Sequence, residues 1–217
     1  ISKFNYNSFN VTPVASKALA FNSDADGFTT ASGSSMILIK TLTASADGTL
    51  SFVDGADSVV LDDTYPVYKF AFINMHPATG QAHFQVNFRD GETAYDAVKT
   101  TTFFESAHAE NASASGLTYM TNHDLAQNTG FQDLAKDQGN ENDESCSGIL
   151  TIYNPSSTVF VKHFMATGNM YNGGNYSVND FVAGYCNTTT AIDGVQFKFD
   201  SGNIDSGTIK LYGIADS

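Results

Sequence analysis

Five histidines are the side chains in this sequence that are best suited to metal binding or acid–base chemistry. No two of them stand at the spacing that places neighbouring imidazoles on one strand or helix, such as one or three intervening residues. We therefore expect scattered structural or surface histidines, and we assign no catalytic, cofactor-binding or metal-binding residue. The five are His76, His83, His108, His123 and His163.

Clustered carboxylates occur at three places where they could hold a calcium ion. Asp24 and Asp26 flank an alanine before a glycine, but the third oxygen ligand and the distal glutamate of a helix–loop–helix calcium site are missing. Asp62 with Asp63, and the acidic loop 137–144, could likewise hold a structural cation. We expect solvated loop charge at all three places and predict no cofactor, with a structural calcium ion as the alternative.

Hydrolytic chemistry lacks its usual supports in this sequence. A glycosidase needs two facing carboxylates in a cleft, often with tryptophan platforms for the sugar rings, and the chain has no tryptophan. No Gly-x-Ser-x-Gly nucleophile motif occurs, and the serine-rich run 31–35 is typical of a linker. The sequence therefore predicts a protein that is not an enzyme, and a secreted glycan hydrolase is the least favoured alternative.

The segment 171–176, with the sequence YNGGNY, combines aromatic and amide side chains. Lectins and receptor-binding tips use such loops, because tyrosine gives a large contact area at a low cost in conformational entropy. Glycine pairs and asparagine also form ordinary turns. We therefore keep a carbohydrate- or host-receptor-binding module at a fibre tip as an alternative function, in which this loop and the stretch 126–145 contact ligand and cation.

The charge balance excludes two classes of partner. Ten basic residues against 23 acidic residues give a formal net charge of -13, which repels nucleic-acid phosphates and anionic membranes. The longest apolar runs, such as 36–39, are far shorter than the roughly 20 residues of a membrane-spanning helix. We expect no nucleic-acid partner and no membrane span. No basic-then-apolar leader follows Ile1, which leaves open whether a leader was removed before it.

The elements that must position these residues are strands. Strict alternation at 65–75 and again at 82–89 predicts two strands joined in a hairpin. A meander is expected at 36–61, and 92–98 holds at most one helical turn. About a dozen short strands predict an all-β, antiparallel β-sandwich of jelly-roll type with very little helix. The other strands are expected at 36–43, 49–53, 58–61, 100–104, 116–125, 148–153, 158–166, 179–185, 191–199 and 207–214.

The chain shows no break in composition, so we expect a single domain over 1–217. Residues 1–26 could form an N-terminal arm that adds a strand to a neighbouring subunit, or the first strand of their own sheet. Residues 126–145, acidic and almost without apolar periodicity, are expected to form a long exposed loop. Cys146 and Cys186 could pair only if the fold brings their neighbouring strands together.

The C-terminal segment 195–214, which ends in the strand GTIKLYG at 207–213, resembles the closing hairpin of tailed-bacteriophage virion structural proteins, especially those of marine phages. Residues 48–55 and 98–104 are also similar to that group, so the resemblance touches most of the chain after Ser35. It implies a β-sandwich module that decorates the capsid or belongs to the tail and its fibres, in symmetric copies. It brings no catalytic motif.

The surface composition agrees with that implication. A surface rich in Ser, Thr, Asn and Gly, with sparse charge, makes polar contacts without burying unpaired ions. We therefore predict a non-enzymatic phage virion structural protein, located in the virion after assembly in the cytoplasm of the bacterial host. The expected partners are other virion proteins and further copies of the chain, for example in a trimer. A host surface glycan is the partner in the alternative function.

Overall fold

The computed structural model describes residues 19–21, 28–30 and 35–215. Within these ranges no residue is helical, so no described segment forms a helix that could cross a membrane. The short strands β1 (Leu19–Phe21) and β2 (Phe28–Thr30) pair with each other in antiparallel fashion. Apart from β1, the predicted arm 1–26 lies outside the described residues and stays a prediction.

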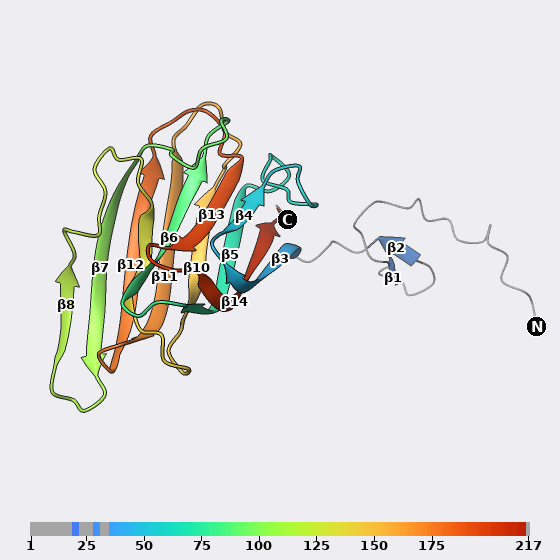
Figure 1. Ribbon diagram of the computed structural model, residues 1–217. Coiled ribbons are helices and arrows are strands. Elements are labelled where there is room, and N and C mark those ends of the chain that lie inside the picture. The colour runs from blue at the N-terminus through green and yellow to red at the C-terminus, as the bar shows by residue number, and fades with distance from the viewer. Residues whose placement is uncertain (1–18, 22–27, 31–34, 216–217) are drawn as a thin grey trace, which may run out of the picture.

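The other strands form one antiparallel hydrogen-bonded sheet that branches at β11 and folds into two layers (Figure 1). We describe each layer as a sheet. The first sheet has the order β3-β14-β5-β10-β11-β12-β7-β8, and the second sheet has the order β4-β13-β6-β9. A single residue pair, Asn172 with Gln138, links the layers through β11 and β9. The first sheet consists of β3 (Met36–Asp47), β14 (Ile204–Ile214), β5 (Val67–Pro77), β10 (Cys146–Tyr153), β11 (Lys162–Asn172), β12 (Tyr176–Cys186), β7 (Lys99–Ala109) and β8 (Ser115–Tyr119). The second sheet consists of β4 (Leu50–Val53), β13 (Gly194–Phe199), β6 (Ala82–Arg89) and β9 (Gln132–Gln138).

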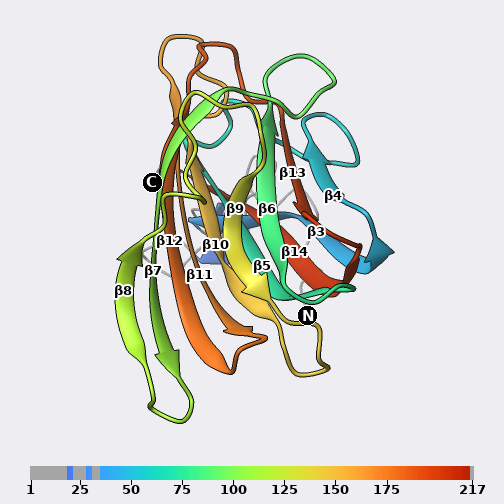
Figure 2. The ribbon, with the colours of Figure 1, turned by 60° about the vertical axis from the view of Figure 1, so that its left-hand side comes forward.

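Eight of these strands follow jelly-roll connections. Within this set, β3, β5, β10 and β14 lie in the first sheet, and β4, β6, β9 and β13 lie in the second. All but one of the connections between successive members cross between the layers, which Figure 2 shows with β6, β9 and β13 in front. The pairs β7–β8 and β11–β12 are inserted hairpins that widen the first sheet only. The predicted antiparallel β-sandwich of jelly-roll type is confirmed.

The hairpin predicted between 65–75 and 82–89 is wrong, although both strands exist. β5 pairs with β14 and β10, whereas β6 pairs with β9 and β13. The ring centroids of Phe72 and Phe84 lie 5.3 Å apart, so these strands face each other across the core. Alternation identifies a core face, but it does not distinguish neighbours in one sheet from partners in facing sheets. The segment 195–214 departs from a hairpin in the same way, because β13 pairs with β4 and β6, and β14 with β3 and β5.

The meander predicted for 36–61 is also wrong. β3 pairs with β14 and β4 pairs with β13, and 58–61 is a loop. Val59 and Leu61 of this loop are buried in the core, which explains their apolar alternation. The Leu61 amide donates to the Asp54 carboxylate over 2.8 Å and fixes the loop there.

The exposed loop predicted at 126–145 is wrong at its centre, where β9 lies. Leu134 and Ala135 of this strand are buried, and so are the glutamines at its two ends, Gln132 and Gln138. The side-chain N–H of Gln138 donates to a main-chain carbonyl of β5 over 2.6 Å, whereas its Oε1 has no hydrogen-bond partner among the described residues. Because glutamines occupy buried positions of this strand, its sequence lacks the apolar alternation that would have predicted it.

Four other predicted elements include residues that do not belong to the element expected there. Residues 116–125 are a strand only as far as the end of β8, and 158–166 only from the start of β11. Residues 191–199 are a strand only from the start of β13. Residues 92–98 contain bends and no helical turn. These differences occur where loops carry apolar or threonine-rich sequence that resembles strand composition.

Aromatic rings from both sheets fill the core. The ring centroid of Phe70 on β5 lies 5.2 Å from that of Phe52 on β4 and 5.6 Å from that of Phe197 on β13. Phe88 on β6 and Phe164 on β11 form another contact at 4.9 Å. All five rings are fully buried. Each such pair contributes about 0.5–1.5 kcal/mol beyond the burial of its area, so these contacts fix how the sheets pack.

Both cysteines are free thiols in the core. Cys146 lies on β10 and Cys186 on β12, and β11 runs between these strands, so the pairing left open by the sequence does not occur. Burial raises the pKa of the Cys186 thiol to about 12 and also raises the pKa of Cys146. Both thiols therefore stay protonated and unreactive at neutral pH.

Candidate functional site

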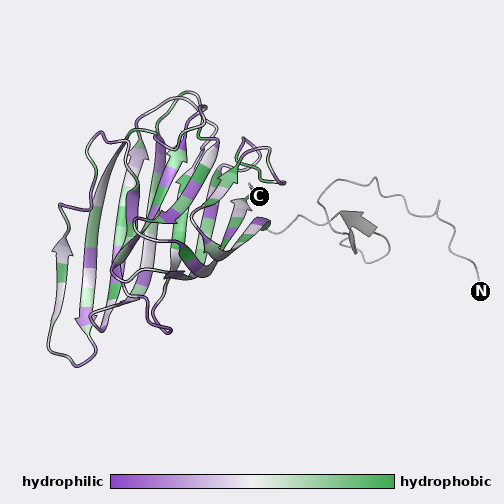
Figure 3. Ribbon diagram, viewed as in Figure 1, coloured by the Kyte–Doolittle hydropathy of each residue, from purple (hydrophilic) through white to green (hydrophobic). Residues whose placement is uncertain are grey.

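One face of the first sheet packs against the second sheet, and strand alternation turns the other side chains away from the core. Apolar residues recur along the strands of both sheets (Figure 3). We call the outward-facing residues of β5, β7, β10, β11 and β12 the outer face. It comprises Val67, Lys69, Ala71, Ile73, Thr100, Thr102, Phe104, Ser106, His108, Ser147, Ile149, Thr151, Tyr153, His163, Met165, Thr167, Asn169, Tyr171, Ser177, Asn179, Phe181, Ala183 and Tyr185.

The outer face contains no acidic residue, although the chain carries a net charge of -13. Its one lysine or arginine is Lys69. The remaining members are aliphatic, aromatic, hydroxyl, amide or imidazole side chains. Because 23 acidic residues are available, their exclusion from five adjacent strands marks this face as chemically distinct.

Several large apolar side chains of the outer face are exposed. Met165 is 54 % exposed and Ile149 is 43 % exposed. Phe104 and Phe181 stack across β7 and β12 with ring centroids 4.8 Å apart, and the same cross-strand row leads through Thr167 to Ile149. Several exposed apolar side chains on one face are typical of an interaction surface.

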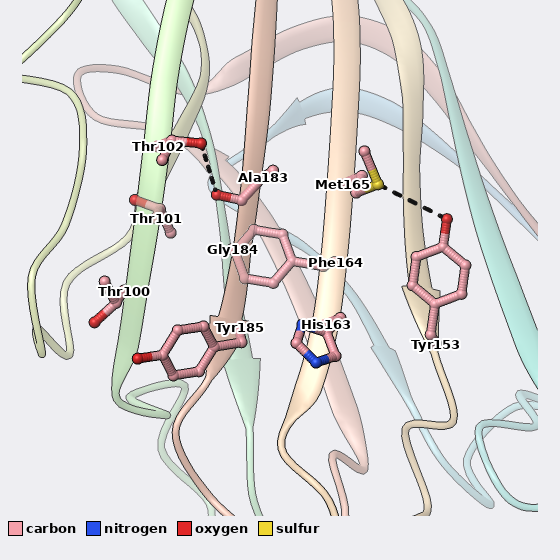
Figure 4. Close-up of a pocket in the computed structure, with 10 residues that line it drawn as sticks. All are labelled: Thr100, Thr101, Thr102, Tyr153, His163, Phe164, Met165, Ala183, Gly184 and Tyr185. Carbon is pink, nitrogen blue, oxygen red and sulfur yellow. Dashed lines mark hydrogen bonds between the residues drawn. The ribbon is translucent and has the colours of Figure 1, made fainter.

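A groove of about 440 Å³ lies at one end of the outer face (Figure 4). The phenol of Tyr153 contacts the Met165 sulfur at 4.0 Å on one side, and the rings of His163 and Tyr185 lie 6.2 Å apart on the other. The Thr102 hydroxyl donates to a main-chain carbonyl of β12 over 3.4 Å. The groove is thus shaped for an apolar or aromatic group flanked by hydroxyls.

The edges of the sheets are a second route to assembly. Among the described residues, β8 pairs only with β7, β3 only with β14, and β4 only with β13. Every residue of β8 is exposed, including Leu117 and Tyr119. Unpaired edges can accept a strand from another chain.

The structure also brings together two histidines that the sequence leaves 40 positions apart. His83 on β6 and His123, from the segment between β8 and β9, stack with ring centroids 5.2 Å apart. Asp133 on β9 accepts from both Nδ1 atoms, at 3.3 Å from His83 and 2.7 Å from His123. Burial alone would raise the pKa of Asp133, but hydrogen bonds from His123, His83 and Gln85 lower it to about 2. The hydrogen bond to Asp133 raises the pKa of His83.

Sequence spacing could not reveal this cluster, because its members come from β6, β9 and the segment that precedes β9. The expectation of scattered histidines holds for the other three. His76 Nδ1 lies 2.7 Å from a main-chain carbonyl oxygen, whereas His108 and His163 belong to the outer face. The stacked pair itself is a departure from that expectation.

Near Asp133 lies a buried carboxyl group, that of Asp180, which no sequence pattern predicts. Asp180 on β12 is 1 % exposed, and its Oδ1 has no hydrogen-bond partner among the described residues. Burial, reinforced by Glu105, raises the pKa of Asp180 to about 7. Lys136 Nζ lies 3.1 Å from Glu105 and 3.0 Å from Asp137, and these contacts raise its pKa against the opposing effect of burial.

Two buried lysines lie at the far end of β7 and β11. Lys99 Nζ donates to Asn87 over 2.5 Å and to the Ala97 carbonyl over 2.8 Å, while Lys162 donates to the Thr188 carbonyl over 3.2 Å. Burial lowers the pKa of Lys99 to about 8. Since both side chains are fully buried and satisfy carbonyl groups, their role is structural.

The remaining sequence candidates form ordinary turns where they are described. In the β11–β12 turn, Asn172 accepts from two main-chain amides, and Tyr171 donates to Asn175 over 2.9 Å. The side-chain oxygens of both asparagines of the predicted ligand loop 171–176 thus accept hydrogen bonds within the turn. Hydrogen bonds from Thr64 lower the pKa of Asp62 and form a similar local turn.

The acidic candidates have different outcomes. Asp24 and Asp26 lie outside the described residues. Asp143, from the end of the stretch 126–145, lines a polar groove of about 470 Å³ together with Asp205. Neither 62–63 nor 137–144 contributes to a group of three ligand side chains close enough to hold an ion among the described residues.

Comparison of the chain with protein-family models, with curated proteins and with solved structures gives no significant match.

Proposed function

We propose that this chain is a non-enzymatic structural protein of a tailed-phage virion, which assembles by packing its outer face against a second copy of itself or a neighbouring virion protein. The observation that carries the proposal is the absence of acidic residues from the outer face of a chain with a net charge of -13. Interface cores are depleted in charged residues and enriched in aromatic residues and methionine. The outer face has this composition.

The net charge of the chain also favours the outer face as the surface through which two copies meet. Two chains that each carry -13 repel each other at long range, so a contact between them needs a patch where no carboxylates meet. Burial of a half-exposed Met165 or Ile149 side chain would contribute on the order of 1 kcal/mol. Several such side chains in a symmetric contact, repeated around an assembly, can offset the entropy cost of association.

The fold gives further support by analogy. Jelly-roll sandwiches occur in viral capsid and lectin domains, although a fold alone does not define a function. The two inserted hairpins widen the first sheet and supply most of the exposed aromatic and methionine side chains of the outer face. The broad face is thus a property of this chain beyond the eight-stranded jelly roll.

The test is immunogold electron microscopy of purified phage particles with an antibody raised against the recombinant chain, counting head and tail labelling separately. Labelled heads support a capsid decoration protein, and labelled tails support a tail or fibre protein. Unlabelled particles, with the same antibody detecting the chain in lysates of infected cells, would overturn the virion proposal.

The groove on the outer face favours a second candidate function, the binding of a host surface glycan. Tyr153 and Tyr185 could stack against a sugar ring while Thr100 and Thr102 supply hydroxyl groups. A glycan array probed with the wild-type chain and with Tyr185→Ala tests this candidate. Binding that the substitution removes would support a receptor-binding role.

A further inference from the structure

The cluster of His83, His123 and Asp133 has a geometry that the assembly function does not use. We propose that it binds a divalent transition-metal ion of the Zn²⁺ class through Nδ1 of both histidines and Oδ2 of Asp133. One ligand atom from each of the three side chains lies within 4.8 Å of the other two. The proposal is independent of the virion role, because it concerns the second sheet and not the outer face.

The distances between the ligand atoms suit a first coordination sphere. Tetrahedral Zn²⁺ with bonds of about 2.0–2.1 Å holds its ligand atoms about 3.3 Å apart. His83 Nδ1 lies 3.3 Å from Asp133 Oδ2, and His123 Nδ1 lies 2.7 Å from the same oxygen. Small rotations of the side chains would therefore admit an ion between them, once each Nδ1 has given up the proton that it now donates to Asp133 and a neutral ring carries its proton on Nε2 instead.

The groups around the ligands are those that metal sites use for support. Ligating histidines commonly donate their second ring N–H to a carboxylate, and His83 Nε2 lies 3.5 Å from Asp137 Oδ1. The second oxygen of Asp133 accepts from Gln85 Nε2 over 2.7 Å, which fixes the orientation of the carboxylate. The His83 main-chain amide donates to Asp200 over 2.7 Å, which holds the start of β6.

Solvent reaches this site, and the types of its ligand atoms determine which metal ions it prefers. The side chains of His83, His123 and Asp133 are 21 %, 15 % and 13 % exposed. An ion can therefore enter, and water can complete its coordination. Two imidazole nitrogens favour Zn²⁺, Cu²⁺, Ni²⁺ or Co²⁺ over the oxygen-seeking Ca²⁺ and Mg²⁺. A bound ion would tie β6 and β9 to the segment that crosses from β8.

The first experiment is calorimetric titration of the full chain with ZnCl₂ near neutral pH, repeated with Co²⁺ to record its visible absorption. We expect about one ion per chain. His123→Ala and Asp133→Asn should each weaken binding by about 100-fold or more, and Asp137→Asn by about 10-fold. His163→Ala on the outer face is the matched control and should leave affinity unchanged.

A second measurement uses the unaltered protein and so does not depend on whether the variants fold. In an NMR titration with Zn²⁺, the imidazole signals of His83 and His123 should shift, whereas those of His108 and His163 should not. Mg²⁺ at the same concentration should move none of them. Failure to bind Zn²⁺, shifts confined to other histidines, or full affinity in folded His123→Ala would overturn the proposal and leave a hydrogen-bonded cluster.

Discussion

At the scale of single residues, the buried carboxyl of Asp180 is expected to make stability depend on pH. Its pKa is about 7 in the folded protein against an ordinary value of 3.8, so the folded state binds the extra proton between these values. The free energy of unfolding therefore falls as pH rises from about 4 to about 7, by on the order of 2–4 kcal/mol. The charged and titratable groups facing Asp180 are Glu105 on β7, Lys136 and Asp133 on β9, and Cys146 on β10.

The variant Asp180→Asn separates this effect from other groups that titrate in the same window. It removes the ionisation and should make the protein more stable than wild type at pH 8, with little difference at pH 4. Urea unfolding at a series of pH values measures both. Asp205→Asn, at an exposed carboxylate, is the control and should follow the wild-type profile. A wild-type profile that rises from pH 4 to pH 7 relative to Asp180→Asn would contradict the argument.

At the scale of elements, the close packing of β5, β10 and β11 depends on Gly148. A Cβ at Gly148 would lie 2.5 Å from the Phe72 ring and would also meet the main-chain oxygen of Thr167. Gly148→Ala should therefore lower the free energy of unfolding by about 1–3 kcal/mol, because neither the strand nor the core ring can easily move. Gly116→Ala on β8, where a Cβ meets nothing within 4 Å, is the matched control. Equal stability of the two variants in thermal or urea unfolding would contradict this account.

Individual elements also show which part of the structure the sequence could reveal. Alternation located β6 to the residue and β5 within two residues at each end, because most of each strand alternates buried and partly exposed side chains. Their pairing was wrong because the short, largely exposed connection 78–81 leads from one sheet to the other instead of turning within a sheet. β9 was missed because Gln132 and Gln138 occupy buried positions, where hydrogen bonds satisfy the side chain of Gln132 and the side-chain N–H of Gln138. Polar burial of this kind is a tertiary effect that local sequence does not encode.

The candidate sites also differ in how far the sequence could have predicted them. The outer face could have been traced from the alternation once the strands were known, because its members are the polar and apolar residues opposite the core positions. The absence of acids from those positions is visible only after five strands far apart in sequence are placed side by side. The stacked pair of His83 and His123 depends on the path of the segment between β8 and β9, for which spacing gives no rule.

At the scale of the whole molecule, the jelly roll with two inserted hairpins separates charge from apolar surface. The described acidic residues lie on loops, on the second sheet, on inward positions, or on β3 and β14 at the rim of the first sheet, whereas the broad middle of that sheet carries none on its outer side. Salt should therefore weaken the long-range repulsion between copies without weakening the short-range attraction through the outer face. Salt screens repulsion between net charges, and it does not weaken apolar burial.

Self-association through the outer face should consequently strengthen as ionic strength rises. Ile149→Glu places a carboxylate in the centre of the outer face and should abolish association at every salt concentration, because each contact would bury an unpaired charge. Phe160→Glu is the matched control, since Phe160 is 72 % exposed but lies in the loop between β10 and β11, outside the outer face. Sedimentation velocity over a range of NaCl concentrations measures both variants against wild type. Association that weakens with salt, or that survives Ile149→Glu, would show that copies meet through charged loops or strand edges and not through this face.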